Sequence, residues 1–270
     1  MGRENWTSEK IFDHLINNKS QKTYWNNISE LRKRANEEVY DQAYKLAKSE
    51  IDKNKIIGIN VLAQLGFAPR IRQQKTVELY FEILENGQND DVLFSLLFGI
   101  GHNNENLTEK QILKLIEFKS SKNKDVRYSL VSALSSIENP NAIETLIELS
   151  EDKFSSIRNV ATFGIGTLSK GNNDQVLRAL WKRTKDQNQD TKLEAIVGLA
   201  NRKVIEVKKI IIEELKNGEY GNLLFEAIEI LKDKDFIPYL KSNLEIAKKD
   251  NRIKEDWITD LKQCLNKLSA

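Results

Sequence analysis

Side chains that usually bind metals or act as nucleophiles are scarce in this chain. It has two histidines, His14 and His102, and one cysteine, Cys264. These are too few for a zinc site built from His and Cys ligands. A serine or cysteine triad needs a histidine beside its nucleophile, and no nucleophile-elbow motif is present. We therefore predict a non-catalytic protein without a metal or a cofactor.

Carboxylates are abundant, but no spacing singles out an acid–base pair. One acidic cluster, Asn89-Asp90-Asp91, stands where a helix is expected to begin. Acidic residues are favoured there by the positive end of the helix dipole. We therefore interpret this group as structural and not as a metal site.

Aromatic residues recur at two equivalent places of successive segments, namely Phe94, Phe98, Tyr128, Phe163 and Phe225. On a helical wheel they point roughly opposite to the main aliphatic stripe. One hypothesis is an exposed strip that binds a partner, since aromatic anchors dominate many interfaces. The alternative is that these rings fill space between neighbouring helices. The exposure of the rings distinguishes the two.

A second group is basic and surrounds a tryptophan. It consists of Arg178, Trp181, Lys182, Arg183 and Lys185, and it is followed by Asp186 and Asp190. A ring for stacking and cations for phosphates would suit a nucleic-acid surface. The alternative is a solvated basic face with Trp181 packed inward. The whole chain has 42 basic and 40 acidic residues, and this balance argues against a strong nucleic-acid footprint.

These residues are positioned by a short pattern that returns six times: an aliphatic residue, another four later, a small or apolar residue at seven and an aliphatic at eight. The copies begin 31 to 35 residues apart, at Ile57, Val92, Val126, Ile157, Thr191 and Leu223. Such a period indicates a stack of helical units. The seventh place holds Gly99, Ala133, Gly164 and Gly198, which we expect to let helices approach closely.

The pattern predicts seven helix pairs and two short helices ahead of them. The pairs are 36–50 with 54–66, 74–86 with 90–102, 108–119 with 124–137, 140–150 with 154–169, 173–185 with 189–201, 203–217 with 219–232, and 234–248 with 251–268. We expect one continuous domain: an N-terminal helical cap (1–35), a repeat array (36–250) and a C-terminal capping helix (251–270), because terminal repeats need a polar outer face.

The composition fits a soluble helical protein. Three prolines and twelve glycines among 270 residues are few, as long helical stretches require. The single cysteine excludes an internal disulfide and suits a reducing compartment. No stretch approaches twenty apolar residues. We predict a cytoplasmic monomer that does not bind membranes.

The residues Asp125-Val126-Arg127, Ala133-Leu134 and Ala142-Ile143-Glu144-Thr145-Leu146 resemble HEAT repeats. In type, these segments are similar to the bacterial HEAT-like repeats first grouped with phycobiliprotein lyases. The similarity extends over about residues 36–250. The resemblance implies an all-α, right-handed α-solenoid of about six to seven helix pairs with helical caps. Nothing in these residues indicates a bilin pocket.

In that family an acidic residue precedes the second helix and a basic one lies just inside it. Here we expect the helix starts to be capped by Asp91, Asp125, Ser156, Asp190 and Asn222. The resemblance further implies a ladder of charged residues that pair between repeats. Its members here are Asp125, Arg127, Arg158, Asp190 and Lys192.

Two hypotheses about function follow. The first is a scaffold that binds a protein or peptide on the concave face, which the second helices line in HEAT arrays. Its expected contacts are Phe94, Phe98, Tyr128, Phe163, Phe225, Trp181 and Arg183. The alternative is a nucleic-acid binder similar to the DNA glycosylases that are built from HEAT-like repeats. By residue type, Trp181 would be the aromatic residue, and Asp186 or Asp190 the acid, that such an enzyme places near the lesion.

Overall fold

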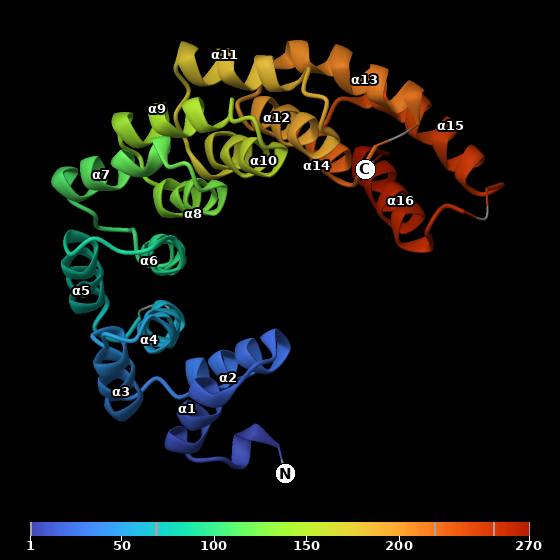
Figure 1. Cartoon of the computed structure of the whole chain (residues 1–270). Coiled ribbons are helices and arrows are strands. Elements are labelled where there is room, and N and C mark those ends of the chain that lie inside the picture. The colour runs from blue at the N-terminus through green and yellow to red at the C-terminus, as the bar shows by residue number, and fades with distance from the viewer. Residues whose placement is uncertain (1, 68–69, 219, 251, 270) are drawn as a thin grey trace. The chain divides into compact units, whose positions relative to one another are not determined.

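A computed structural model describes residues 2–67, 70–218, 220–250 and 252–269, and every regular element in these ranges is a helix (Figure 1). The predicted all-α fold of consecutive helix pairs is therefore confirmed. All seven predicted pairs are present, from α3 with α4 to α15 with α16, and most edges lie within four residues of the prediction. Glu219 and Asn251, the predicted first residues of two helices, lie outside the described residues.

The α-helices are α1 (Ser8–Asn17), α2 (Gln21–Lys33), α3 (Glu37–Ala47), α4 (Asp52–Gln64), α5 (Gln73–Glu85), α6 (Asp90–Gly101), α7 (Glu109–Ile116), α8 (Lys124–Leu134), α9 (Pro140–Leu149), α10 (Ser155–Phe163), α11 (Asp174–Arg183), α12 (Gln189–Asn201), α13 (Lys208–Asn217), α14 (Leu223–Leu231), α15 (Ile237–Ala247) and α16 (Glu255–Ser269). Short 3-10 turns occur at Arg3–Asn5, Glu117–Ser120, Ile205–Val207 and Lys234–Phe236.

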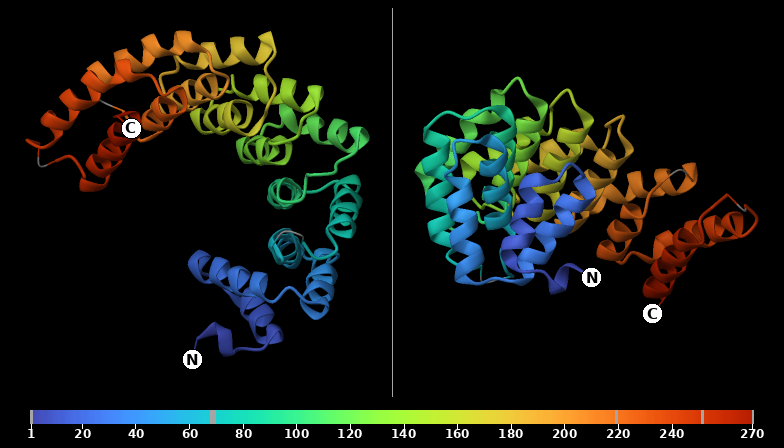
Figure 2. Two further views of the ribbon diagram at one scale, coloured as in Figure 1. Left: turned by 180° about the vertical axis from the view of Figure 1, so that it is seen from behind. Right: turned by 60° about the horizontal axis from the view of Figure 1, so that its bottom comes forward.

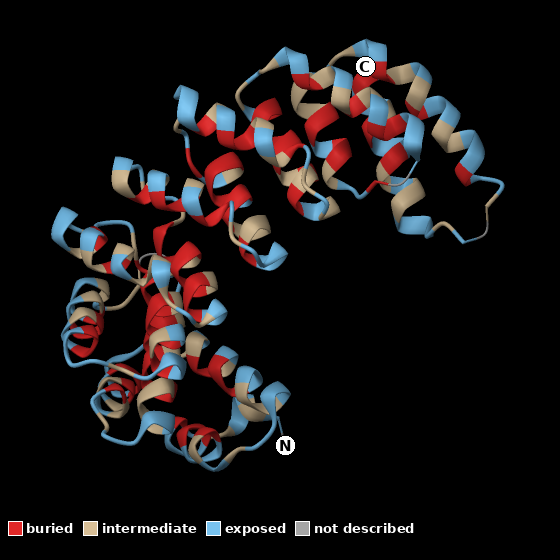
Figure 3. Cartoon of the chain, turned by 45° about the horizontal axis from the view of Figure 1, so that its top comes forward, coloured by how far each residue is buried: buried red, intermediate tan, exposed pale blue. Residues whose placement is uncertain are grey.

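The chain forms two compact units, which we call the N-terminal unit (Met1–Leu134) and the C-terminal unit (Ser135–Ala270). In each unit the second helices of the pairs form one layer and the first helices another (Figure 2). The buried residues lie along the faces where helices meet (Figure 3). The predicted cap boundaries at 35 and 250 stay predictions.

Small residues let the helices of the N-terminal unit pack backbone against backbone. A Cβ atom on Gly58 of α4 would lie 2.2 Å from the backbone N of Ala47 in α3. At Gly99 the same atom would lie 3.0 Å from the ring of Tyr80, which is fully buried. The Tyr80 hydroxyl donates a hydrogen bond to the carbonyl O of Ile59 at 2.8 Å. The space beside Gly99 is thus taken by a ring that links α5 to α4.

A similar close approach occurs in the C-terminal unit, between α12 and the segment that follows α10. That segment, Gly164–Leu168, is a turn of π-helix. A Cβ atom on Gly198 of α12 would lie 2.7 Å from the Cα of Gly166 and 2.9 Å from a methyl of Leu180. The predicted role of Gly198 in close packing therefore has a specific cause, because its neighbour is another glycine.

Arg202, the residue after α12, holds the end of this π-helical turn. Its guanidinium donates five hydrogen bonds to backbone carbonyls, those of Ile165 (2.6 Å), Gly166 (2.7 Å), Gly171 (2.9 Å), Gly198 (2.9 Å) and Ser169 (3.1 Å). Carbonyls at a helix end lack partners within the helix. Arg202 supplies those partners and ties the π-helical turn to α12.

Candidate functional site

Three aromatic side chains form a continuous row on the second helices of the N-terminal unit. Phe94 and Phe98 lie on α6, and their ring centroids are 4.8 Å apart with an angle of 67° between the planes. The ring of Tyr128 on α8 follows at 6.0 Å from that of Phe98. Phe94 is 37% exposed, and Phe98 and Tyr128 are half-buried. We call these three side chains the aromatic row.

The local sequence explains why the rings meet. Phe94 and Phe98 are four residues apart and so lie on one face of α6. Helix α8 can come close to α6 because residue 101 is a glycine. A Cβ atom at this position would lie 2.6 Å from the carbonyl O of Ser132. This close packing brings Tyr128 within reach of Phe98. Edge-on and tilted contacts at these distances are favourable for aromatic pairs.

An exposed carboxylate stands one turn before the aromatic residues on each helix. Asp91 precedes Phe94 by three residues, and Asp125 precedes Tyr128 by three. Neither carboxylate forms an ion pair with another described residue. The N-terminal end of the aromatic row is therefore negatively charged.

The prediction that these acids cap their helices is wrong. The caps are asparagines two residues earlier: Asn89 accepts a hydrogen bond from the backbone N of Val92, and Asn123 from that of Asp125. Asn188 likewise caps α12 ahead of Asp190. The cap residue has extended backbone, from which a short side chain reaches the free amides. The aspartates lie inside the first turn, where they face the helix dipole instead. Asn222 makes no side-chain cap.

The two remaining aromatic candidates lie in the C-terminal unit and differ from each other. Phe163, the last residue of α10, is 36% exposed. Phe225 is only 3% exposed, because its ring packs against Tyr220 at 5.7 Å and Trp257 of α16 at 5.4 Å. Phe225 thus attaches α16 to α14 and is not available to a partner. For this residue the space-filling alternative is the right one.

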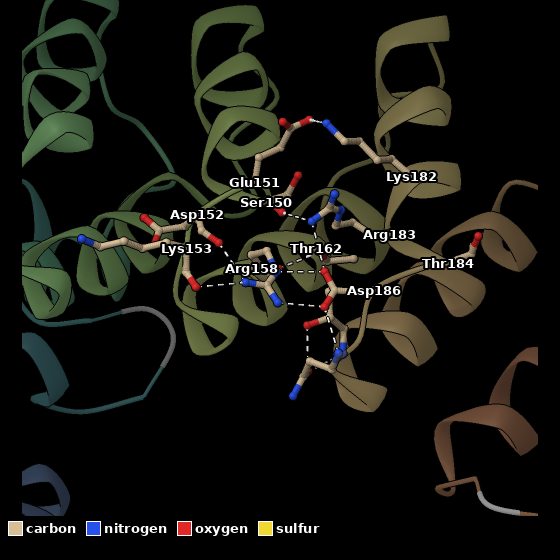
Figure 4. A network of polar contacts seen from close by, with 12 residues as sticks. Ser150, Glu151, Asp152, Lys153, Arg158, Thr162, Lys182, Arg183, Thr184 and Asp186 are labelled. Carbon is tan, nitrogen blue, oxygen red and sulfur yellow. Dashed lines mark hydrogen bonds and ion pairs between the residues drawn. The ribbon is translucent and has the colours of Figure 1, made fainter.

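A network of charged residues connects the repeats of the C-terminal unit (Figure 4). Arg158 of α10 forms two hydrogen bonds with the Asp186 carboxylate, at 2.8 and 2.9 Å. Arg183 of α11 contacts the same carboxylate at 3.1 Å and donates to the carbonyl O of Ser150. The Asp186 side chain is 4% exposed. Hydrogen bonds from Arg158 lower the pKa of Asp186 from its ordinary value, so this carboxylate stays ionised.

Two of the four cations in the basic group around Trp181 are engaged in such contacts. Lys182 pairs with Glu151 at 2.6 Å, and Arg183 is committed to Asp186. Trp181 itself is half-buried, and Arg178 and Lys185 are exposed. A carboxylate held between two guanidinium groups is not free to act as a base, so Asp186 does not suit the glycosylase role that its residue type suggested.

The comparisons with known proteins agree with this geometry. Residues 126–152 match the family described as PBS lyase HEAT-like repeat. The fold is similar to that of YibA from Escherichia coli, with a TM-score of 0.70, 20% identity, and coverage of 98% of this chain and 93% of YibA. One segment of the chain thus matches a HEAT-like repeat, and the whole chain has the fold of a helical-repeat protein.

Two engineered proteins have folds similar to that of this chain. The first has a TM-score of 0.54 and 13% identity, with coverage of 97% of this chain and 78% of its own. The second has a TM-score of 0.51 and 18% identity, with coverage of 74% and 99%. At these identities the likeness concerns the fold alone. No curated protein sequence matches the chain.

The charged contacts of this protein use different partners from those that the family pattern suggested. The acidic partner of Arg158 is Asp186, four residues before Asp190. Lys192 pairs with Glu214 of α13 at 3.2 Å. Arg127 is buried and donates to the carbonyl O of Ser121 at 2.7 Å. Asp190 is exposed at the start of α12.

Sequence reasoning did not single out Arg202, nor Asp186 as the partner of Arg158. Arg202 follows the repeated pattern, so only its five carbonyl contacts reveal its importance. Within the described ranges, no group of three or more His, Cys, Asp or Glu side chains is placed to bind a metal ion. Among the same residues, no helix combines the length and apolar character needed to cross a bilayer.

Proposed function

We propose that this helical-repeat protein is a non-catalytic interaction scaffold that binds a protein or peptide segment on the second-helix face of its N-terminal unit. The observation that supports this proposal is the half-exposed aromatic row of Phe94, Phe98 and Tyr128 on adjacent helices. In HEAT arrays the corresponding face lines the concave side, and solenoids use such surfaces for binding.

The energetics of the aromatic row suit an interface. Aromatic side chains contribute much of the binding energy in protein complexes, and truncation of an anchor costs about 2 kcal/mol or more. Here the rings of Phe94, Phe98 and Tyr128 already contact one another in the unbound chain. Little side-chain entropy is then lost on binding, where each mobile side chain would cost about 0.5–1.5 kcal/mol.

A selection of random twelve-residue peptides on the full-length chain tests this proposal. We expect peptides that bind in the micromolar range, and we expect Phe94→Ser with Phe98→Ser to weaken them at least tenfold. Leu113→Ser is the matched control, because Leu113 is 49% exposed on α7, a first helix of the same unit. Circular dichroism checks that both variants fold.

Equal binding by the double variant and the wild type would show that the aromatic row is not the contact. Duplex and single-stranded oligonucleotides across a salt series form the second arm, because phosphate contacts weaken steeply with salt. Salt-sensitive oligonucleotide binding that survives the double variant would favour the nucleic-acid alternative and contradict the scaffold proposal.

A further inference from the structure

A long groove runs between α5 and α7, two consecutive first helices of the N-terminal unit (Figure 1). It consists of two adjoining cavities of about 520 and 460 Å³, which share Glu78 of α5 and both Thr108 and Gln111 at the start of α7. The lining residues of α5 extend over its full length of 13 residues, so the groove is about 20 Å long. Its apolar side chains are half-buried, namely Val77, Phe81 and Leu107. We call it the α5–α7 groove.

The two walls of the α5–α7 groove carry charges of opposite sign. Glu78, Glu82 and Glu85 line it from α5, and their spacing of four and three residues places them on one face of that helix. Lys110 and Lys114 line it from α7 and are four residues apart, again on one face. Lys114 is half-buried, and the other four residues are exposed. The groove therefore has an acidic wall, half-buried apolar side chains and a basic wall.

The same arrangement also occurs between α9 and α11 of the C-terminal unit. Three glutamates on α9 have the same spacing and two cations on α11 are again four residues apart: Glu144, Glu148, Glu151, Arg178 and Lys182. Ile147 stands where the α5–α7 groove has Phe81, three residues after the first glutamate. This second cavity is smaller, about 290 Å³, and Lys182 reaches across it to Glu151 at 2.6 Å (Figure 4). An internal ion pair thus joins the walls of the second groove.

The charges of the α5–α7 groove do not pair across it among the described residues. Lys114, at the place of Lys182, pairs instead with Glu117, three residues further along the chain, at 2.7 Å. Glu82 pairs with Lys48 at 3.1 Å. Exposed pairs of this kind contribute little to stability, so a partner can replace them. The other three charged residues form no ion pair with another described residue, namely Glu78, Glu85 and Lys110. Both walls of this groove therefore keep charges that a partner can neutralise.

We propose that the α5–α7 groove binds an amphipathic helix of a partner protein, whose apolar stripe is flanked by basic residues on one side and acidic residues on the other. The stripe packs on Val77, Phe81 and Leu107, the basic flank faces the glutamates of α5, and the acidic flank faces the lysines of α7. An amphipathic helix in an apolar groove is a common mode of recognition. Complementary charges select the partner and fix its direction along the groove. This site does not depend on the aromatic row, which lies on the second helices.

Three designed helical peptides of fourteen residues test this proposal on the full-length chain. They share one stripe of leucines and a fluorescein label, and they differ in their flanks: one basic and one acidic, both basic, or both acidic. Fluorescence anisotropy gives the Kd of each peptide. We expect the mixed-charge peptide to bind at least tenfold more tightly than the other two, because each of those places like charges against one wall. Added salt should reduce this difference, since the charges are at the surface.

A charge reversal of one wall should change which peptide is preferred. Glu78→Lys with Glu85→Lys makes both walls basic, so it should weaken the mixed-charge peptide at least tenfold and tighten the peptide with two acidic flanks. Glu144→Lys with Glu151→Lys is the matched control, because it makes the same charge change at exposed places of the second groove. It should leave the order of the three peptides as in the wild type. Circular dichroism checks that both variants fold.

Three results would overturn the proposal. The first is equal binding of the three peptides, or an order that Glu78→Lys with Glu85→Lys does not change. The second is loss of binding in Phe94→Ser with Phe98→Ser, which would place the peptide on the aromatic row. The third is self-association of the wild type in sedimentation velocity that the glutamate variant abolishes, because the occupant of the groove would then be a second copy of this chain.

Discussion

Arg202 allows the most demanding test of how the C-terminal unit is held together. Its replacement by methionine keeps a long apolar stem and removes all five hydrogen bonds to the carbonyls between Ile165 and Gly198. Each hydrogen bond to a charged group contributes about 1.5–3 kcal/mol in isolation. The five are not additive, because one guanidinium makes them all and its burial carries a desolvation cost. Freed carbonyls can also regain water.

We therefore expect Arg202→Met to lower the free energy of unfolding by about 3 kcal/mol, near the upper end of what single substitutions cost. Urea unfolding followed by tryptophan fluorescence suits the measurement, since Trp181 and Trp257 lie in the C-terminal unit. Arg202→Lys should recover only a small part of the loss, because an ammonium group cannot reproduce the planar fork. Arg252→Met, at an exposed position, should have no measurable effect.

The comparison of these three variants decides the argument. A loss below about 1 kcal/mol for Arg202→Met would show that water replaces the guanidinium at little cost, contrary to the range expected for buried polar networks. If Arg202→Lys were as stable as the wild type, the positive charge alone would matter and the planar fork of the guanidinium would be irrelevant.

Three further predictions concern the C-terminal unit. Gly198→Ala should destabilise it by about 2 kcal/mol despite the better helix propensity of alanine, because the new methyl would lie 2.7 Å from the Gly166 backbone. The control is Gly221→Ala, whose Cβ would approach nothing closer than 3.5 Å and which should be nearly neutral in urea unfolding. Desolvation, with the nearby Glu226 and Asp190, raises the pKa of Glu194 from 4.5 to about 7, so the folded state binds a proton more tightly than the unfolded state and stability falls as pH rises through this window. Glu194→Gln should therefore stabilise the chain at pH 8 by about 1 kcal/mol, after allowance for solvent screening, and change its stability little at pH 4.5. If the variant and the wild type had equal urea midpoints at both pH values, this prediction would be contradicted. Burial raises the pKa of Cys264 to about 12, so its thiol should resist alkylation in the native chain and react in urea, and rapid labelling of the native protein would refute this packing.

The aromatic and charged positions show where sequence reasoning reached its limit. Phe94 and Phe225 have the same residue type at matching places of their helices. Phe94 remains exposed, whereas Phe225 is covered by Tyr220 and Trp257, which belong to other elements. The wheel position says which way a side chain points. It does not say whether another helix lies there.

The sequence by itself determined the helix pairs, their order and the tight contacts at Gly99, Gly164 and Gly198. The reason is that the 3.6-residue period and small side chains act locally, within one helix and its immediate neighbour. Tertiary structure alone decided the partners at longer range: Asp186 for Arg158, and the carbonyls around Gly166 for Arg202. Such partners depend on distances between separate helices, which a linear pattern of residue types does not specify.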